Sequence, residues 1–223
     1  MVDYRGIILG VMGHSGVGKD TMADRLIDKH GFVKMGLADE IKRTCKKIYD
    51  FSDLQLWGPS EERNKPDLRY PIPGKGHLSP RVALQTFGTE GGRACYPNTW
   101  IDLTLRNCDR ILTDGTDYDQ KQGVFESSFW KRGRYQGVAI PDVRFKNELD
   151  AIHSKGGYII RLRRKGVDGN VGLKGHASEE EQKSIMDHEC DFVLDVPEGF
   201  ANFYAEIDAL MMKIPKVSLR SVK

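Results

Sequence analysis

Residues 13–21 read GHSGVGKDT and directly follow the apolar run GIILGVM of residues 6–12. A glycine-rich loop between a buried strand and a helix presents backbone N–H groups to phosphate oxygens, and the helix directs its positive end at the same anion. Lys19, at the end of this loop, is spaced to reach the β- and γ-phosphates. The pattern therefore predicts a site for a nucleoside triphosphate. Its expected ligands are Gly13, Ser15, Gly16, Val17, Gly18, Lys19, Asp20 and Thr21.

Asp20 departs from the usual loop of this kind, in which a serine or threonine follows the lysine and contacts Mg²⁺. A carboxylate is unfavourable directly against phosphate, because like charges repel. Asp20 can act on Mg²⁺ through a bound water while the Thr21 hydroxyl takes the usual role, so both are candidate metal ligands. It can also pair with a basic residue of a substrate loop, or only favour the helix dipole. Lys19 and Asp20 are the candidate catalytic residues of the loop.

Arg81 and Arg93 flank the segment LQTFGTEGG, which also contains Glu90. Phosphoryl transfer brings two anions together, so cations must surround both. The forked donors of arginine suit the phosphate of an acceptor, and Glu90 can orient an arginine or touch the sugar or base. From spacing alone, a solvated helix face is the simpler interpretation of all three residues.

Asp142 and Arg144 follow the apolar residues VAI. Ligands of open parallel α/β sheets bind where the strands end, so both side chains are predicted to bind the substrate, and Arg144 is a third candidate catalytic residue. The alternative for Asp142 is an N-cap of the next helix. Arg161 and Arg163, in the segment RLRRKG, are predicted to contact ATP at the start of a lid. Their alternative is the charged end of a surface strand.

Short apolar runs, predicted as strands, alternate with segments of helical period. The predicted strands are residues 6–12, 32–35, 137–145, 158–164 and 190–196. The predicted helices are residues 19–30, 38–51, 79–93, 98–109, 146–157, 178–186 and 199–214. Ile41, Cys45 and Ile48 are predicted to face inward in the second of these helices. The alternation indicates an α/β fold, with a parallel sheet of about five strands and helices on both faces.

Three segments are predicted to lie outside this core and to move. Residues 52–78 contain four prolines and many charges, and residues 113–136 show no clear period. Both are expected over the acceptor site, and residues 161–178 are expected to form the lid. The whole chain, residues 1–223, is predicted to be a single domain, because its length suits one large core.

The composition excludes several classes of protein. A formal net charge of +2 is too small to indicate a surface for polymeric nucleic acid. No apolar stretch approaches the roughly 20 residues that span a membrane, and the N-terminus lacks the pattern of a signal peptide. The four cysteines have no zinc-knuckle spacing and are expected to be reduced thiols. We therefore expect a cytoplasmic protein without membrane partners.

Five blocks occur in the order GHSGVGKDT, LADEIKR, LQTFGTEGGR, PDVRFKNE and HASEEE. They resemble those of the phage-type deoxynucleoside monophosphate kinases, which are P-loop kinases related in fold to adenylate and guanylate kinases. The resemblance covers about residues 6–212, although residues 113–136 match no pattern. It implies transfer of the ATP γ-phosphoryl group, with Mg²⁺, to a deoxynucleoside 5′-monophosphate in nucleotide supply for DNA synthesis. It also favours Arg93 as an acceptor ligand and, for a phage-encoded enzyme, the host cytoplasm.

Two alternatives remain from the sequence. Phosphomevalonate kinases share the Lys–Asp–Thr loop, so another small-molecule kinase of that type, or of the dephospho-coenzyme A kinase type, is the nearest rival. A non-enzymatic module that binds ATP to switch a partner surface would bind ATP without acceptor-dependent turnover. The sequence decides neither the accepted bases nor the strictness for deoxyribose. Small kinases of this type can be homodimers, and the oligomeric state is equally undecided.

Overall fold

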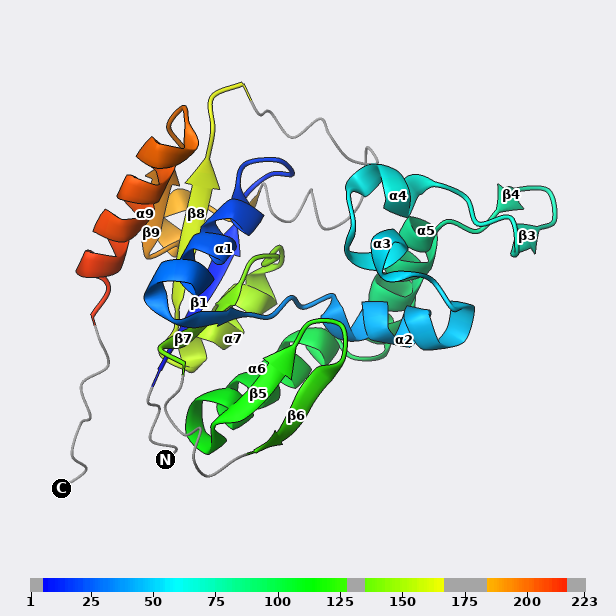
Figure 1. The fold of residues 1–223 in the computed structure, drawn as a ribbon, viewed down its shortest axis with the longest axis horizontal. Helices are drawn as coiled ribbons and strands as arrows, with labels where there is room; N and C mark the ends of the chain where they lie inside the picture. The colour runs from blue at the N-terminus through cyan, green and yellow to red at the C-terminus, as the bar shows by residue number, and fades with distance from the viewer. Residues whose placement is uncertain (1–5, 128–134, 167–183, 216–223) are drawn as a thin grey trace.

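The structure is a computed structural model that describes residues 6–127, 135–166 and 184–215. At its centre lies a sheet of five parallel strands in the order β2-β7-β1-β8-β9 (Figure 1). These strands are β1 (Ile7–Met12), β2 (Phe32–Lys34), β7 (Gly137–Ile140), β8 (Tyr158–Arg163) and β9 (Phe192–Asp195). Each lies inside a segment predicted as a strand, so the predicted α/β class and the strand number are confirmed.

Helices pack on both faces of the sheet. The longer ones are α1 (Lys19–His30), α2 (Asp39–Tyr49), α6 (Thr99–Asp114), α7 (Lys146–Ser154) and α9 (Phe200–Lys213). In β1, Ile7, Leu9 and Val11 pack with α1 and α9, whereas Ile8 and Met12 pack with α6 and α7. Because both faces are covered, every residue of β1 is buried, which explains its uninterrupted apolar sequence.

Asp208 joins the two helices on one face of the sheet. From α9, its carboxylate accepts hydrogen bonds from Arg25 Nη2 and Lys29 Nζ of α1, both at 2.6 Å. His30 Nε2 lies 2.7 Å from the other carboxylate oxygen. Hydrogen bonds from Arg25 hold the pKa of Asp208 well below its usual range, although partial burial opposes this.

Residues 52–78 pack beside α2, away from the sheet (Figure 1). They form α3 (Asp53–Trp57), α4 (Ser60–Asn64) and a hairpin of β3 (Pro71–Ile72) and β4 (Gly76–His77). A separate apolar cluster holds this part together, and its buried members are Ile41, Cys45, Phe51, Leu56 and Ala83. The segment therefore lies outside the main core but contains helices that the sequence analysis did not predict. The predicted inward position of Ile48 is wrong, because this side chain is 53% exposed.

The predicted helix at residues 79–93 has two parts. It begins as α5 (Pro80–Gln85), where the Ser79 side chain accepts the Val82 N–H as expected of an N-cap. It continues as the π-helical segment η1 (Thr86–Arg93), which contains the glycine-rich sequence. The wider π-helical turn is a common feature of functional sites.

Residues 116–127 form a hairpin where the sequence showed no period. Helix α6 extends beyond its predicted end to Asp114, and β5 (Thr116–Asp119) then pairs antiparallel with β6 (Gly123–Ser127), separately from the main sheet. Most of the predicted helix at residues 178–186, and the lid residues 167–178, fall outside the described residues. Within the described ranges, no helix is long and apolar enough to cross a membrane.

Candidate active site

The loop of residues 13–18 joins the carboxyl end of β1 to α1 at the middle of the sheet. A Cβ on Gly13 would lie 2.6 Å from the carbonyl oxygen of Leu162, so only glycine fits there. Gly18, the N-cap of α1, has a φ of 113°, and in the described part of the chain no side chain caps this helix. Val17 is buried while Ser15 is exposed. The first N–H groups of α1 are therefore available to an anion.

Lys19 reaches back across this loop. Its Nζ donates hydrogen bonds to the carbonyl oxygens of Gly13 (2.6 Å) and His14 (2.7 Å). Burial and the nearby Arg144 lower the pKa of Lys19 to about 8, although Asp20 and other carboxylates oppose this shift. The charged form of Lys19 is therefore disfavoured mainly by burial, and an anion bound beside it would favour that form.

Asp20 projects from the first turn of α1 with 82% of its side chain exposed. Its Oδ1 lies 2.7 Å from Lys34 Nζ, at the end of β2, and the pKa of Asp20 is lowered because this partner outweighs desolvation of the carboxylate. The pairing partner is thus a lysine of the sheet, and not a residue of the two long predicted substrate segments. Thr21 follows within α1 and is partly buried.

Arginines from three further segments lie near one another, and two of them, Arg63 and Arg144, lie near residues 19–20 at the end of the loop. Burial and the charge of Arg81 lower the pKa of Arg63, with a further contribution from Arg144. Arg63, in α4, donates to Ser60 Oγ and to a backbone carbonyl, and Arg81, in α5, donates to the side chain of Asn64. The exposed Arg144 lies in the segment after β7, near enough to lower the pKa of the loop lysine. The structure therefore places Arg144 beside Lys19 of the loop and Arg63 beside both Arg81 and Arg144, while the acceptor roles of Arg81 and Arg144 remain predictions.

Arg93 ends η1 and packs against the start of α7. Its guanidinium lies 3.5 Å from the centroid of the Phe145 ring, so it stacks on this face. Its Nη2 donates to Asn147 Oδ1 at 3.2 Å, and its Nη1 lies 3.5 Å from Glu148 Oε1. The side chain is only 16% exposed. Arg93 therefore has three protein partners, all on or beside α7, which is not the solvated position that spacing alone favoured.

Glu148 is buried in the first turn of α7. Its Oε2 accepts the N–H groups of Arg144 (2.8 Å) and Phe145 (3.1 Å). Burial raises the pKa of Glu148 to about 7, although these N–H groups and Arg93 oppose the shift. Phe145 is the N-cap of α7, so the alternative role of Asp142 as that cap is wrong.

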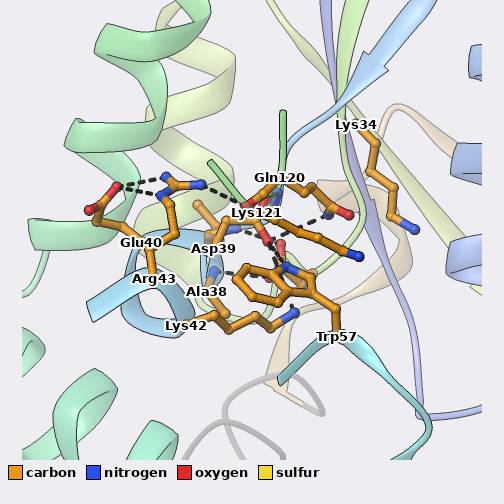
Figure 2. A network of polar contacts seen from close by, with 12 residues as sticks. Lys34, Ala38, Asp39, Glu40, Lys42, Arg43, Trp57, Gln120 and Lys121 are labelled. Atoms are coloured by element: carbon orange, nitrogen blue, oxygen red, sulfur yellow. Dashed lines mark hydrogen bonds and ion pairs between the residues drawn. The ribbon is translucent and has the colours of Figure 1, made fainter. Parts of the chain in front are cut away.

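Asp39, the first residue of α2, is 1% exposed and lies at the centre of the polar network in Figure 2. Its Oδ2 accepts hydrogen bonds from the Gly36 N–H (2.7 Å) and the Tyr118 hydroxyl (2.6 Å). Its Oδ1 lies 3.4 Å from Trp57 Nε1 and 4.0 Å from Lys42 Nζ. Burial raises the pKa of Asp39, and Lys42 and Tyr118 oppose this. One carboxylate thus joins α2 to α3 and to the β5–β6 hairpin.

Arg43 makes a second connection between α2 and this hairpin. Its Nη1 donates to the carbonyl oxygen of Gln120 (2.8 Å) and to the Tyr118 hydroxyl (3.3 Å), and its Nη2 donates to Glu40 (2.6 Å). These contacts bury the arginine to 8% exposure, although it is not one of the residues predicted to face inward in this helix. The hairpin therefore covers the side of α2, and its predicted position over the acceptor remains a prediction.

Asp142 connects the end of β7 to the segment before α2. Its carboxylate accepts the N–H groups of Leu37 (2.9 Å) and Ala38 (3.2 Å). A Cβ on Gly36 would lie 3.1 Å from Asp39 Oδ1 and 3.2 Å from Asp142 Oδ2. Two carboxylates therefore crowd this glycine and fix the turn that leads into α2.

Arg161 and Arg163 are engaged in ion pairs with the segment that precedes and includes β9. Arg161 Nη1 and Arg163 Nη1 lie 3.1 Å and 2.8 Å from Asp187, and Arg163 also binds both oxygens of Asp195 at 2.9 Å. These contacts show where both arginines are held, and their contact with ATP remains a prediction. Glu90 is exposed on η1.

The comparisons with known proteins decide the family. No family model matches the chain. A protein of Acanthamoeba polyphaga mimivirus, described as "Putative deoxynucleotide monophosphate kinase", is 33% identical over 208 residues, which cover 90% of this chain and 94% of that protein. The chain belongs to the deoxynucleotide monophosphate kinase family. It is accordingly a P-loop kinase, a nucleotide-binding phosphotransferase.

Two solved structures are more distant in sequence from this family member. A dephospho-CoA kinase from Campylobacter jejuni is 14% identical, with a TM-score of 0.44, over 95% of this chain and 99% of its own. The protein TT1252 from Thermus thermophilus is also 14% identical, with a TM-score of 0.46 over the same shares. At these scores, the assignment of the fold rests on the strand order and on the loop after β1.

This deoxynucleotide kinase family member has charged site residues that the sequence analysis did not single out. They are Lys34, Asp39, Lys42, Arg63 and Glu148. Asp39 and Lys42 lie in the block LADEIKR, and Glu148 lies in PDVRFKNE. Those blocks were the available signal, because LADEIKR follows the predicted strand of residues 32–35 and PDVRFKNE follows the apolar residues VAI, so both lie near the edge of the sheet where ligands bind.

Proposed function

We propose that the protein transfers the γ-phosphoryl group of ATP to a deoxynucleoside 5′-monophosphate and so forms the diphosphate. One observation carries this proposal. Lys19 of the loop, Arg63 of α4 and Arg144 after β7 lie near one another, and burial together with neighbouring cations lowers the pKa of Lys19 and of Arg63. Such a group of cations is unfavourable alone and becomes favourable when two phosphate-bearing substrates meet between them.

The donor half of the site is the loop of residues 13–18 with Lys19. Backbone N–H groups of the loop and of the first turn of α1 hold the triphosphate. Lys19 exchanges the carbonyl oxygens of Gly13 and His14 for phosphate oxygens, and its charge stabilises the transferring group. The ion pairs of Arg161 and Arg163 compete with any contact to ATP, so we leave both out of the proposed donor site.

The residues at the start of α1 fit Mg²⁺. The Asp20 carboxylate is exposed there, and Thr21 adds a hydroxyl oxygen one residue later. Magnesium prefers oxygen ligands, keeps several waters and is usually held by one or two protein groups together with phosphates. When bound, the ion neutralises charge on the β- and γ-phosphates. The ion pair with Lys34 limits the freedom of the Asp20 carboxylate to move.

The acceptor half is built from arginines. Arg63 lies near both Arg81 and Arg144, and Arg144 lies near the loop lysine, so these arginines can share the acceptor phosphate. Arg93 supports the same site from η1. Asp142 contributes by fixing the segment that carries α2, and exposed Glu90 lies on η1 for a contact to sugar or base. The deoxynucleotide is chosen as acceptor because the mimivirus relative is described by that substrate class.

The test is a turnover assay with a panel of acceptors. The protein is mixed with ATP and Mg²⁺, each deoxy- and ribonucleoside monophosphate is offered in turn, and ADP is measured with a coupled assay. We expect turnover that depends on a deoxynucleoside monophosphate. Turnover with dephospho-coenzyme A or phosphomevalonate instead would identify the rival kinases. Tight ATP binding without turnover of any acceptor would identify the binding module.

A further inference from the structure

Each carboxylate oxygen of Glu148 contacts a different segment of the chain, and each of these segments carries an arginine. Oε2 accepts the backbone N–H of Arg144 at 2.8 Å, and Oε1 lies 3.5 Å from Nη1 of Arg93. The two arginines belong to η1 and to the segment after β7, and they are separated by 51 positions in the sequence (144 − 93). The carboxylate itself is 5% exposed, so it does not touch a substrate.

We propose that Glu148 is a positioning residue that holds Arg93 and Arg144 in register for a single acceptor phosphate. The inference rests on the proposed function, because it assigns both arginines to the acceptor. Its physical basis is that a buried anion with fixed partners holds the Arg93 guanidinium and the backbone that carries Arg144 before the substrate arrives. Displacement of such a group by about 1 Å commonly reduces the rate about a hundredfold.

The stacking on Phe145 supports the same role. This ring lies under the Arg93 guanidinium at 3.5 Å, and Asn147 takes one of its N–H groups. The arginine thus has its plane fixed by the ring and its direction fixed by two polar groups of α7. A guanidinium has five N–H donors, so donors are left over for a phosphate after these contacts.

Replacement of Glu148 by glutamine separates positioning from helix capping. The amide oxygen of an E148Q chain can still accept the N–H groups of Arg144 and Phe145, so α7 keeps its first turn. The amide NH₂ then faces Arg93, donor against donor, and the ion pair is lost. Asp150→Asn is the matched control, because it makes the same chemical change on α7 at an exposed carboxylate that pairs with Lys146.

We expect E148Q to raise the KM for the deoxynucleoside monophosphate about tenfold and to leave the KM for ATP within about twofold. D150N should change neither. Adding Arg93→Ala to E148Q should give the same acceptor KM as Arg93→Ala alone, because glutamine acts only through this arginine. An acceptor KM that is unchanged, or that rises together with the KM for ATP, would overturn the positioning role. A lower acceptor KM would do so too, because the carboxylate would then compete with the phosphate for Arg93.

The pH profile of the unmodified protein gives a second measurement, which holds even if E148Q fails to fold. Glu148 faces Arg93 from η1 and Asp142 and Arg144 from the segment after β7, and burial raises its pKa to about 7. The acceptor KM should therefore rise as the pH falls through about 7. The phosphate of the substrate also titrates, near pH 6, so its own effect on the acceptor KM appears at a lower pH. An acceptor KM that rises only near pH 6, with the titration of the substrate phosphate, would count against the positioning role of Glu148. If no monophosphate is turned over by the unmodified protein, the proposed function fails instead.

Discussion

The charge on Lys19 is expected to set the upper pH limit for ATP. Burial and Arg144 lower the pKa of this ammonium from 10.5 to about 8. At about 1.4 kcal/mol per pH unit, the difference corresponds to roughly 3 kcal/mol for charging the lysine in the empty site. Phosphates placed beside the lysine bring negative charge and reverse this penalty, so the pKa of Lys19 rises when ATP binds.

The sign of the pH effect follows from which form binds ATP. The protonated lysine attracts the triphosphate, and this form is lost as the pH rises through about 8. At pH 9 only about one molecule in ten still carries the charge, so kcat/KM for ATP should be about tenfold lower than at pH 7. The value of kcat should stay constant to a higher pH, because it reports the complex, in which the lysine is held protonated.

The assay is a steady-state measurement of kcat and kcat/KM for ATP between pH 6.5 and 9.5 at saturating acceptor. Lys19→Met should reduce turnover on the order of a hundred- to a thousandfold, as expected for loss of one transition-state donor. Lys19→Arg should have low activity, but its kcat/KM for ATP should not fall at alkaline pH, because a guanidinium stays protonated. A kcat/KM for ATP that stays constant to pH 9.5 in the unmodified protein would contradict this role of the Lys19 charge. So would a K19R chain whose kcat/KM for ATP still falls at alkaline pH.

Three further changes have distinct expected outcomes. Arg144→Ala should raise the acceptor KM at least about tenfold and lower kcat, and equal effects on both substrates would contradict its acceptor role. Asp20→Asn should raise the Mg²⁺ concentration for half-maximal rate with less effect on ATP affinity, whereas weaker monophosphate binding at unchanged Mg²⁺ dependence would assign Asp20 to the acceptor. Asp208→Asn should reduce the free energy of unfolding at pH 7 by about 1–2 kcal/mol, measured by urea titration. Because the pKa of Asp208 is lowered on folding, this difference should shrink below about pH 4, and a constant difference would exclude the ion pairs as its cause.

The sheet and the phosphate loop could be predicted because their signals are local. The run GIILGVM is buried on both faces in β1, and such strands are read directly from continuous apolar sequence. The cap at Ser79 and the glycines of the loop are also local, since each depends on neighbours a few residues away. The same logic placed Asp142 and Arg144 at the edge of the sheet, where the carboxyl ends of parallel strands meet.

The partners of the site residues could not be predicted, because they come from distant positions. Tyr118 is 79 residues from Asp39, and Arg93 is 55 residues from Glu148. Arg43 occupies a polar position by helical period and is buried only because the β5–β6 hairpin folds over it. A helical pattern states which residues share a face, but it does not state which other segment will cover that face.

Gly36 has a consequence for sequence variation and for mutational scanning. The φ angle of Gly36 is not positive, so its backbone conformation is open to any residue. A methyl group there would nevertheless press on the carboxylates of Asp39 and Asp142, which hold the turn before α2. A scan of all substitutions should therefore find alanine at position 36 less tolerated than the backbone conformation alone implies, and larger side chains less tolerated still. A poor tolerance of substitution at Gly36 would then result from its contacts with two carboxylates, and not from a backbone conformation that only glycine adopts.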